Sequence, residues 1–360
     1  MRARGFPEGG LRPYTAVMVV PTGIGAAIGG YAGDALPTAR VVASVVDRLI
    51  THPNVMNGAQ LYWPLPNALY VEGFGLDQFA AGRWGLRPVH RNRIGLVLDA
   101  ALEDDLRGRH RQAAEASRAT LGLDVRDYVI TDVPLGVTLR QAESGATWGT
   151  LERPDSLLRA VEKALAAGAE AVAVVARFPD DEEEADLETL HNYRLGQGVD
   201  LVAGAEAVIS HLVVRSFGVP CAHAPALSPL PLDSSVSPKA AAEEIGYTFL
   251  PCVLAGLSRA PQFVTGGDRQ GGDVWADQVD AMLIPAGACG GSAVLSLSRT
   301  KTLIIAVAEN RTTLNVPLAA LGGSVVPVAS YLEAIGVIAA HRAGVHPQAL
   351  MPQVPHLLSI

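Results

Sequence analysis

The fold follows from the stretch AVMVVPTGIGAAIGGYAGDALP, which runs from Ala16 to Pro37. Its first five residues form a short apolar run, and the part after Pro21 is dense in glycine. A helical pattern then covers residues 38–49, with Pro37 at a first-turn position that helices tolerate. The order strand, glycine loop, helix predicts the start of a βαβ unit.

The same alternation of short apolar runs and helical patterns continues along the chain. Strands are predicted at 94–98, 127–133, 171–176, 282–285 and 303–307, and helices at 103–121, 155–167, 204–217 and 330–343. This predicts an α/β fold with mainly parallel sheets and helices on both faces, Rossmann-like in outline. We expect two α/β halves, 1–150 with the glycine-rich loop and 151–360 with the Cys/His and GACGG loops, and a site between them.

The composition excludes several classes of protein. The 360 residues are 49% hydrophobic and 18% charged, so the chain has a large core to bury and is not disordered. A net charge of −8 argues against a nucleic-acid partner. Three widely spaced cysteines form no disulfide framework, and the longest apolar runs are too short to span a bilayer. These features predict a cytoplasmic protein with a small-molecule substrate and no membrane partner, and they leave a homo-oligomer open.

The glycine-rich loop is the first candidate for binding. Gly23, Gly25 and Gly29 are spaced GxGxxxG, one residue longer than the dinucleotide fingerprint, and the acidic Asp47 falls inside the helical pattern. A true dinucleotide site is therefore not expected. The loop could instead bind a phosphate or carboxylate through its backbone N–H groups, with Asp34 facing the bound group, or it could simply allow close packing.

A second polar group follows the first predicted helix, in residues 51–57. His52 titrates near neutral pH, and Asn54 and Asn57 can orient a carbonyl or carboxylate group. The alternative is a polar turn that caps its own backbone. Amphipathic side chains that could line a nearby pocket come next: Tyr62, Trp63, Asn67, Tyr70 and Glu72.

A third group combines a helix with the segment after it. Glu206 and Ser210 are four residues apart, so they can share a helix face, and His211 is the next residue along. Cys221 and His223 are two residues apart, so their side chains point the same way on a strand. We expect His211 and His223 to act in catalysis. A divalent metal at Cys221, His211 and His223 is a weaker alternative because the paired spacing of strong zinc motifs is missing. The sequence requires no cofactor.

A fourth group surrounds Cys289, which precedes Gly290 and Gly291 between a predicted strand and a helix. A helix N-terminus there would lower the pKa of the thiol, as in a nucleophile, whereas a small buried residue is the alternative. The next strand is followed by Glu309 and Asn310. If the two strands are adjacent, Glu309 is a candidate general acid or base and Asn310 a substrate-binding residue.

Several of these strings together resemble a known family. Residues 21–34 (PTGIGAAIGGYAGD) and 51–57 (THPNVMN) resemble the domain-of-unknown-function family 3326, which is associated with cyanobacteria, plastids and some actinobacteria. Residues 209–211, 222–225 and 308–310 are similar to it too, so the resemblance covers most of the chain. It implies one single-family unit and no particular activity.

The candidate residues favour an enzyme that acts on a small anionic metabolite by acid/base proton transfer, as isomerases, racemases and lyases do. Gly23, Gly25, Asp34, Gly290 and Gly291 are the expected anion-binding residues. A metal-dependent hydrolase of a small amide or ring substrate is one alternative. A nucleotide- or metabolite-binding regulatory protein without catalysis is the other.

Overall fold

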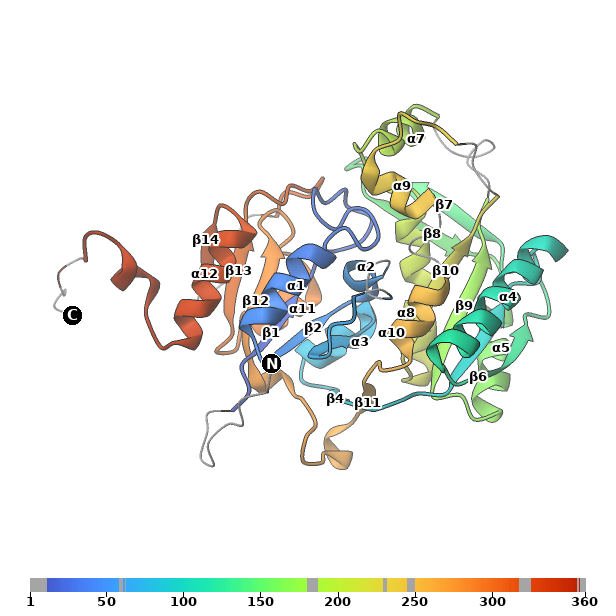
Figure 1. Cartoon of the computed structure of the whole chain (residues 1–360), viewed down its shortest axis with the longest axis horizontal. Helices are drawn as coiled ribbons and strands as arrows, with labels where there is room; N and C mark the ends of the chain where they lie inside the picture. The colour runs from blue at the N-terminus through green and yellow to red at the C-terminus, as the bar shows by residue number, and fades with distance from the viewer. Residues whose placement is uncertain are drawn as a thin grey trace.

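The computed structural model describes residues 12–57, 61, 63–179, 187–228, 232–244, 250–316, 325–354 and 356, without the side chains of residues 187 and 188. Two parallel sheets lie side by side, each at the centre of one lobe (Figure 1). The predicted α/β fold with parallel sheets and helices on both faces is confirmed. Tyr62, expected to line a pocket, lies outside the described residues.

The first lobe is built on the sheet β14-β13-β12-β1-β2-β3, in which all neighbouring strands are parallel. Its strands are β1 (Thr15–Met18), β2 (Arg48–Thr51), β3 (Ala68–Tyr70), β12 (Val279–Pro285), β13 (Leu303–Val307) and β14 (Val325–Val328). Helices α1 (Leu36–Val45) and α12 (Tyr331–Arg342) pack on one face. Helices α3 (Gly73–Ala80) and α11 (Ser292–Leu297) pack on the other. This sheet takes strands from both of the expected halves, 1–150 and 151–360.

The second lobe is built on the parallel sheet β10-β9-β5-β6. Its strands are β5 (Ile94–Leu98), β6 (Val125–Ile130), β9 (Ala171–Arg177) and β10 (Cys221–Ala226). Helices α4 (Asp104–Leu121) and α10 (Leu250–Leu257) cover one face, and α5 (Pro154–Ala166) and α8 (Ala203–Phe217) cover the other. The central strand β9 is buried from Ala171 to Ala176, which explains its unbroken apolar sequence.

Several shorter elements lie outside the two main sheets. An antiparallel hairpin, β7 (Val137–Gln141) and β8 (Thr147–Leu151), packs on α8, and β4 (Gly85–Arg87) pairs with β11 (Gln262–Val264). The remaining helices are α2 (Pro53–Met56), α7 (Leu187–Arg194) and α9 (Pro238–Glu244), with 3₁₀ turns η2 (Gly266–Asp268), η3 (Ala276–Gln278) and η5 (Pro347–Leu350).

The helix predicted over residues 38–49 is wrong at its C-terminal end. Helix α1 stops at Val45, and Arg48 and Leu49 pair with β1 as the start of β2. Asp47 lies between the two elements, accepts a hydrogen bond from the Tyr14 backbone (2.8 Å) and pairs with Arg342 (2.5 Å). This puts Asp47 at the amino end of β2, away from the edge at which a dinucleotide ribose would bind.

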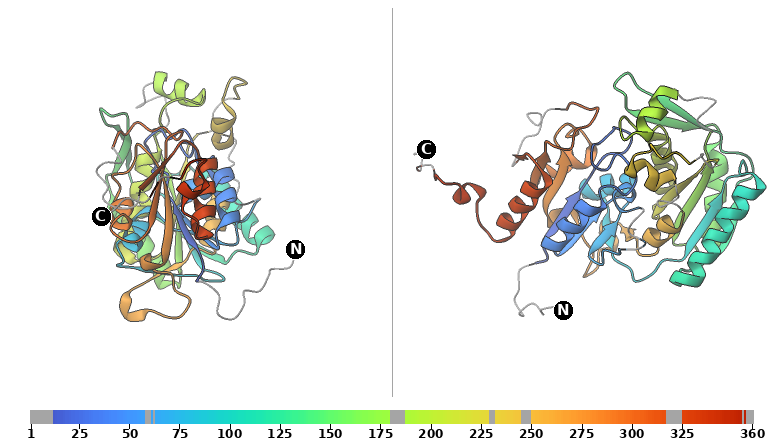
Figure 2. Two further views of the ribbon diagram at one scale, coloured as in Figure 1. Left: turned by 90° about the vertical axis from the view of Figure 1, so that its left-hand side faces the viewer. Right: turned by 45° about the horizontal axis from the view of Figure 1, so that its top comes forward.

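One apolar core joins the lobes on the face that carries α1, α12, α10 and α4 (Figures 1 and 2). Tyr70 at the end of β3 is buried there, with its ring against Gly256 of α10. A Cβ atom at Gly256 would lie 2.6 Å from the Tyr70 ring, so this helix position needs a glycine. The two lobes therefore share buried surface instead of meeting only through linkers.

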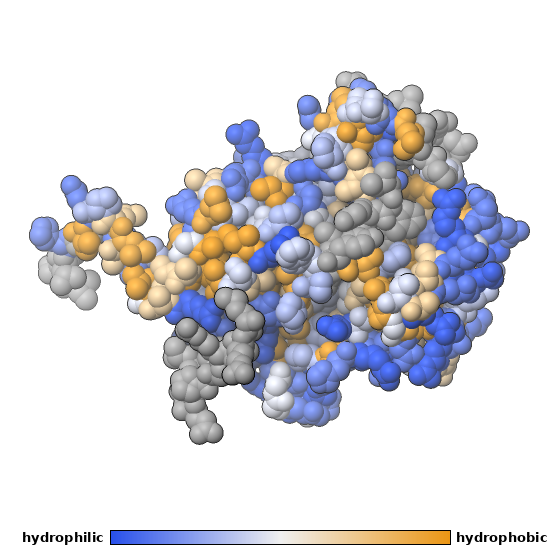
Figure 3. All heavy atoms as spheres, viewed as in Figure 1, coloured by the Kyte–Doolittle hydropathy of each residue, from blue (hydrophilic) through white to orange (hydrophobic). Residues whose placement is uncertain are grey.

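The described residues after α12 lie outside the two lobes. Beyond α12 the segment with η5 projects outward, and Leu350 and Val354 are 68% and 65% exposed on it (Figures 1 and 3). No helix within the described residues has both the length and the apolar character needed to cross a bilayer.

Two helix-interior glycines test the shared core. Gly256→Ala should destabilise the protein by about 1–3 kcal/mol because the new methyl group overpacks Tyr70. Gly108→Ala in α4, where a Cβ atom would meet nothing, should stabilise it by about 0.5–1 kcal/mol. Urea unfolding measures both, and equal effects of the two substitutions would contradict the packing described for α10.

Candidate functional site

The carboxyl ends of both sheets face the same side of the molecule. The loop after β1 carries Tyr31, and the ring of Tyr31 stacks on Tyr193 of α7, which follows β9 (centroids 4.5 Å apart, 17° between planes). The Tyr31 hydroxyl also donates to the Tyr193 carbonyl (2.7 Å). In α/β folds ligands bind at this edge, so the boundary between the lobes is where a site is expected.

Five polar side chains, Glu72, Glu206, Ser210, His211 and His223, form what we call the interlobe site. Glu72 follows β3 of the first lobe, whereas the other four come from α8 and β10 of the second. His211 Nδ1 lies 2.5 Å from Glu72 Oε1. The Glu72 side chain is 3% exposed and that of His211 is 44% exposed. The ring is thus anchored on its buried nitrogen and open to solvent elsewhere.

The backbone of α3 fixes the Glu72 carboxylate. Glu72 is the N-cap residue, and its Oε2 accepts hydrogen bonds from the N–H groups of Phe74 (2.8 Å) and Gly75 (3.3 Å). These donors and the positive end of the helix complement a negative charge. One carboxylate therefore caps α3 with one oxygen and orients His211 with the other.

The electrostatics of His211 follow from this arrangement. Burial of the ring opposes protonation, but the bond to Glu72, its charge, the Ala207 carbonyl and the charge of Asp77 together raise the pKa of His211. Gly73 makes room for the ring, since a Cβ atom there would lie 2.8 Å from His211 Cε1. A carboxylate-held imidazole is the arrangement that orients a general base.

The second histidine of the interlobe site also has a carboxylate partner. His223 Nε2 lies 3.4 Å from Glu206 Oε2, and His223 Nδ1 lies 3.0 Å from the Ser210 hydroxyl. With its proton on Nε2, facing Glu206, the neutral ring accepts a hydrogen bond from Ser210 on Nδ1. Ser210 itself is buried, 2% exposed.

The two histidines lie at the same part of the lobe boundary. His211 and Ser210 are neighbours on α8, and the Ser210 hydroxyl lies 3.0 Å from His223 Nδ1. His223 lies two residues after Cys221 on the same face of β10, about 7 Å along the strand. The two histidines that the sequence analysis grouped are thus linked through neighbouring residues of α8, and their role in catalysis stays a prediction.

A second cluster, which we call the clasp, also links the two lobes and consists of Tyr31, Asp34, Tyr193, Lys239 and Glu243. Lys239 Nζ lies 2.8 Å from Asp34 Oδ2 and donates to the Ala27 carbonyl (2.7 Å). Glu243 accepts from the Ala32 N–H and from the Tyr193 hydroxyl, both at 2.5 Å. The loop after β1 and helix α9 lie together in Figure 1.

Acidic groups are crowded around the clasp. Burial raises the pKa of Glu243 to about 7, helped by the charges of Glu206 and Asp34 and opposed by its hydrogen bonds. Burial also raises the pKa of Asp200 well above its ordinary value, with Glu243 and Glu206 adding to it. Clusters of carboxyl groups with perturbed pKa values are typical of functional sites.

The glycine loop divides into two parts. Gly23 and Gly25 have φ angles of +73° and +56° and pack tightly, because Cβ atoms there would lie 2.7 Å from Thr147 and 2.8 Å from Val199. In the later part of the loop, two backbone N–H groups donate to carboxyl groups: the Gly29 N–H to Asp34 Oδ1, and the Ala32 N–H to Glu243. Burial raises the pKa of Asp34, and Lys239 opposes that effect.

His52, Asn54 and Asn57 brace this loop and its neighbours. His52 is buried and accepts a hydrogen bond from the Val20 N–H (3.0 Å), and burial lowers its pKa to about 4. Asn54 donates to the Gly29 carbonyl (2.8 Å), and Asn57 accepts from the Tyr70 hydroxyl (2.9 Å). All three therefore have structural partners, and His52 is neutral near pH 7.

The surroundings of Cys289 differ from those expected. Its thiol is 1% exposed, lies near the Ala286 carbonyl (3.4 Å) and has its pKa raised by burial, so the expected lowering is wrong. The six-residue helix α11 begins after Gly291, and a Cβ atom at Gly290 would lie 3.2 Å from Val316. Cys289 fits the alternative of a small buried residue.

Glu309 and Asn310 follow β13 and connect the glycine loop to α12. Glu309 is exposed and accepts a hydrogen bond from the Tyr331 N–H (2.7 Å). Asn310 accepts from the Ile28 N–H (2.9 Å) and donates to the Ile28 carbonyl (2.8 Å). They hold the loop in place and lie on a different part of the edge from His211.

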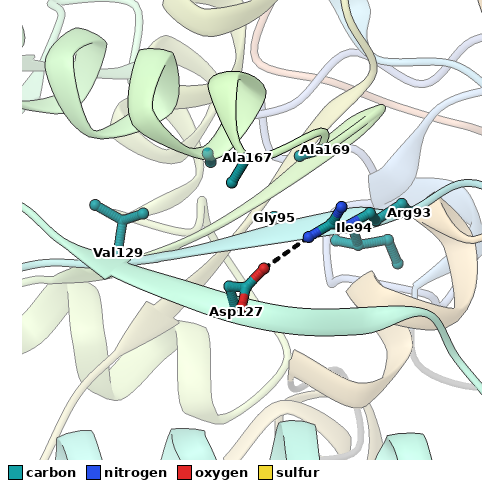
Figure 4. Close-up of a pocket in the computed structure, with 8 residues that line it drawn as sticks. Arg93, Ile94, Gly95, Asp127, Val129, Ala167 and Ala169 are labelled. Atoms are coloured by element: carbon teal, nitrogen blue, oxygen red, sulfur yellow. Dashed lines mark hydrogen bonds and ion pairs between the residues drawn. The ribbon is translucent and has the colours of Figure 1, made fainter.

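Two other features could have pointed to a functional site: a group of metal ligands and the hollow drawn in Figure 4. Within the ranges that the structure describes, no three His, Cys, Asp or Glu side chains are grouped so that they could hold a metal ion, and His211 and His223 each face a carboxylate. The hollow in Figure 4 lies at the amino ends of β5 and β6, beside the ion pair of Arg93 and Asp127. None of the residues that line the hollow belongs to the interlobe site.

Comparison with known proteins identifies relatives of the whole chain. The model of a family described as a protein of unknown function, DUF3326, matches residues 15–351. An uncharacterized lipoprotein of Synechococcus sp. is 62% identical over 341 residues, which cover 95% of this chain and 94% of the relative. The resemblance drawn from the loop sequences is confirmed.

Substitution of Glu72 tests the central pair of the interlobe site. In the wild-type protein His211 should titrate above its ordinary pKa of about 6.5. Glu72→Gln removes the stabilising charge but keeps the burial, so the midpoint of His211 should fall. Histidine NMR titration measures this, with Glu115→Gln on the surface of α4 as a control for the loss of a charge. An unchanged midpoint in the Glu72 variant would refute the pairing.

Proposed function

This chain belongs to the DUF3326 family, and we propose that it is an enzyme that moves a proton on a small anionic metabolite bound between its lobes. The observation that carries the proposal is the 2.5 Å contact between His211 Nδ1 and the buried Glu72 carboxylate, on a ring that is 44% exposed. A general base needs an orienting partner on one nitrogen and access to substrate at the other.

In the proposed reaction His211 takes a proton from the substrate through Nε2. Glu72 stabilises the imidazolium that forms, since its charge favours the protonated ring. His223, with Glu206 on Nε2 and Ser210 on Nδ1, is the second group able to accept or return a proton at this boundary. Proton removal and return without a change of oxidation state is the chemistry of isomerases, racemases and lyases.

Solvent exchange tests this function before the substrate is known. A panel of small carboxylates and phosphates is incubated with the protein in D₂O, and exchange of carbon-bound hydrogen is followed by NMR. For any compound that exchanges, His211→Gln should lower the rate at least about 100-fold, the usual range for a general base. His90→Gln, in an exposed loop, is the matched control.

The alternatives give different results in the same assay. A metal-dependent hydrolase would cleave a compound of the panel in a way that chelators stop. A binding protein would retain a ligand without exchange or cleavage. Exchange that survives in the His211 variant would contradict the role given to that residue.

We further propose a cytoplasmic location for the folded chain; the Synechococcus relative is named a lipoprotein, which favours the alternative of a lipid-anchored protein. A lipid linked through cysteine needs an accessible thiol. Cys221, Cys252 and Cys289 are all buried, so none of these residues can carry a lipid in the folded protein. Cell fractionation should find the protein outside the membrane pellet, and recovery from the pellet only with detergent would contradict this location.

A further inference from the structure

The glycine loop already donates hydrogen bonds to carboxyl groups, and these groups come from the protein itself. The Gly29 N–H donates to the Asp34 carboxylate, and the Ala32 N–H donates to the Glu243 carboxylate (2.5 Å). Asp34 belongs to the loop and closes it locally. Glu243 comes from α9 in the other lobe, more than 200 residues further along the chain.

The surroundings of Glu243 form a complete cradle for a carboxylate. One oxygen accepts from the Ala32 N–H, and the other accepts from the Tyr193 hydroxyl (2.5 Å). Lys239 lies one turn earlier on α9, and its ammonium group reaches the same loop at Asp34 and at the Ala27 carbonyl. A backbone N–H, a phenol and a nearby ammonium are donors that suit a carboxylate or a phosphate equally.

We propose that this cradle is the anion subsite of the enzyme, and that Glu243 occupies it in place of the carboxylate or phosphate group of the substrate. The inference rests on the proposed function, because it assigns the anionic end of the proposed metabolite. The substrate group displaces the Glu243 side chain and takes over the bonds from Ala32 and Tyr193. Glu243 thus keeps the empty subsite filled.

The charges around the clasp bear on such an exchange. The Glu243 carboxylate is close enough to Asp34 and Glu206 for their charges to disfavour its ionised form. An incoming anion meets the same charges, so its binding depends on the donors that Glu243 gives up, the Ala32 N–H and the Tyr193 hydroxyl. Lys239, whose side chain is 43% exposed, stays beside the loop to balance the charge of the ligand.

The test measures binding of inorganic phosphate by titration calorimetry. Glu243→Ala empties the cradle and leaves its donors, so it should bind phosphate at least about tenfold more tightly than the wild type. Glu244→Ala is the matched control: it removes the neighbouring acid of α9, which pairs with Arg194 (2.8 Å) and not with the loop, and its affinity should match the wild type. Thermal unfolding reports whether each variant is folded.

Two further variants make the outcome specific. Adding Tyr193→Phe to Glu243→Ala removes one donor and should lose most of the gained affinity. A folded Glu243→Ala protein that binds phosphate no better than the wild type, or equal gains in the Glu243 and Glu244 variants, would overturn the proposal. Tighter phosphate binding by Glu243→Ala, with no compound of the panel exchanging in the wild-type protein, would retain the subsite and refute the proposed reaction.

Discussion

The buried carboxylate of Glu72 is the constraint on which the site depends. A negative charge at the boundary between two apolar lobes is costly unless its oxygens are bonded. Two N–H groups of α3 donate to one oxygen, and the other oxygen is paired with His211, whose Nδ1 lies 2.5 Å away. Because α3 belongs to the first lobe and His211 to the second, the same carboxylate couples the position of the His211 ring to the way the lobes are docked.

The two lobes create the site by presenting parallel strand ends to one another. Loops after β1 and β3 meet α8, α9 and the strand β10 across the boundary, and the shared core around Tyr70 holds them there. The interlobe site and the clasp are joined by charge, since Glu206, which holds His223, also acts on Glu243. The proposed proton transfer and the proposed anion binding would therefore take place in one continuous group of polar side chains.

The sequence predicted the fold well because buried parallel strands and amphipathic helices have local signatures. Its strand at 171–176 and its helix at 204–217 reappear as β9 and α8, whereas the helix at 38–49 overran because β-branched residues suit both elements. Pairing of β1 with β12 depends on contacts more than 260 residues apart, which periodicity does not encode.

The site was predicted in part for the same reason. His211, Ser210 and His223 were grouped through their spacing on one helix and the next strand. Glu72 was noted only as a possible wall of a pocket, although its position after a strand and before a helix was a usable signal. Nothing local marked Glu243 or Lys239, and nothing local showed that Cys289 would be buried.

The position of the proton on the neutral His211 ring is the most direct test of the pairing between His211 and Glu72. Nitrogen-15 NMR of the histidine side chains, recorded well above the pKa of His211, distinguishes the two tautomers. We expect a proton on Nδ1, facing Glu72, and a lone pair on Nε2 that can accept a proton from substrate. A proton found on Nε2 would leave no basic nitrogen facing the substrate and would contradict the role proposed for His211.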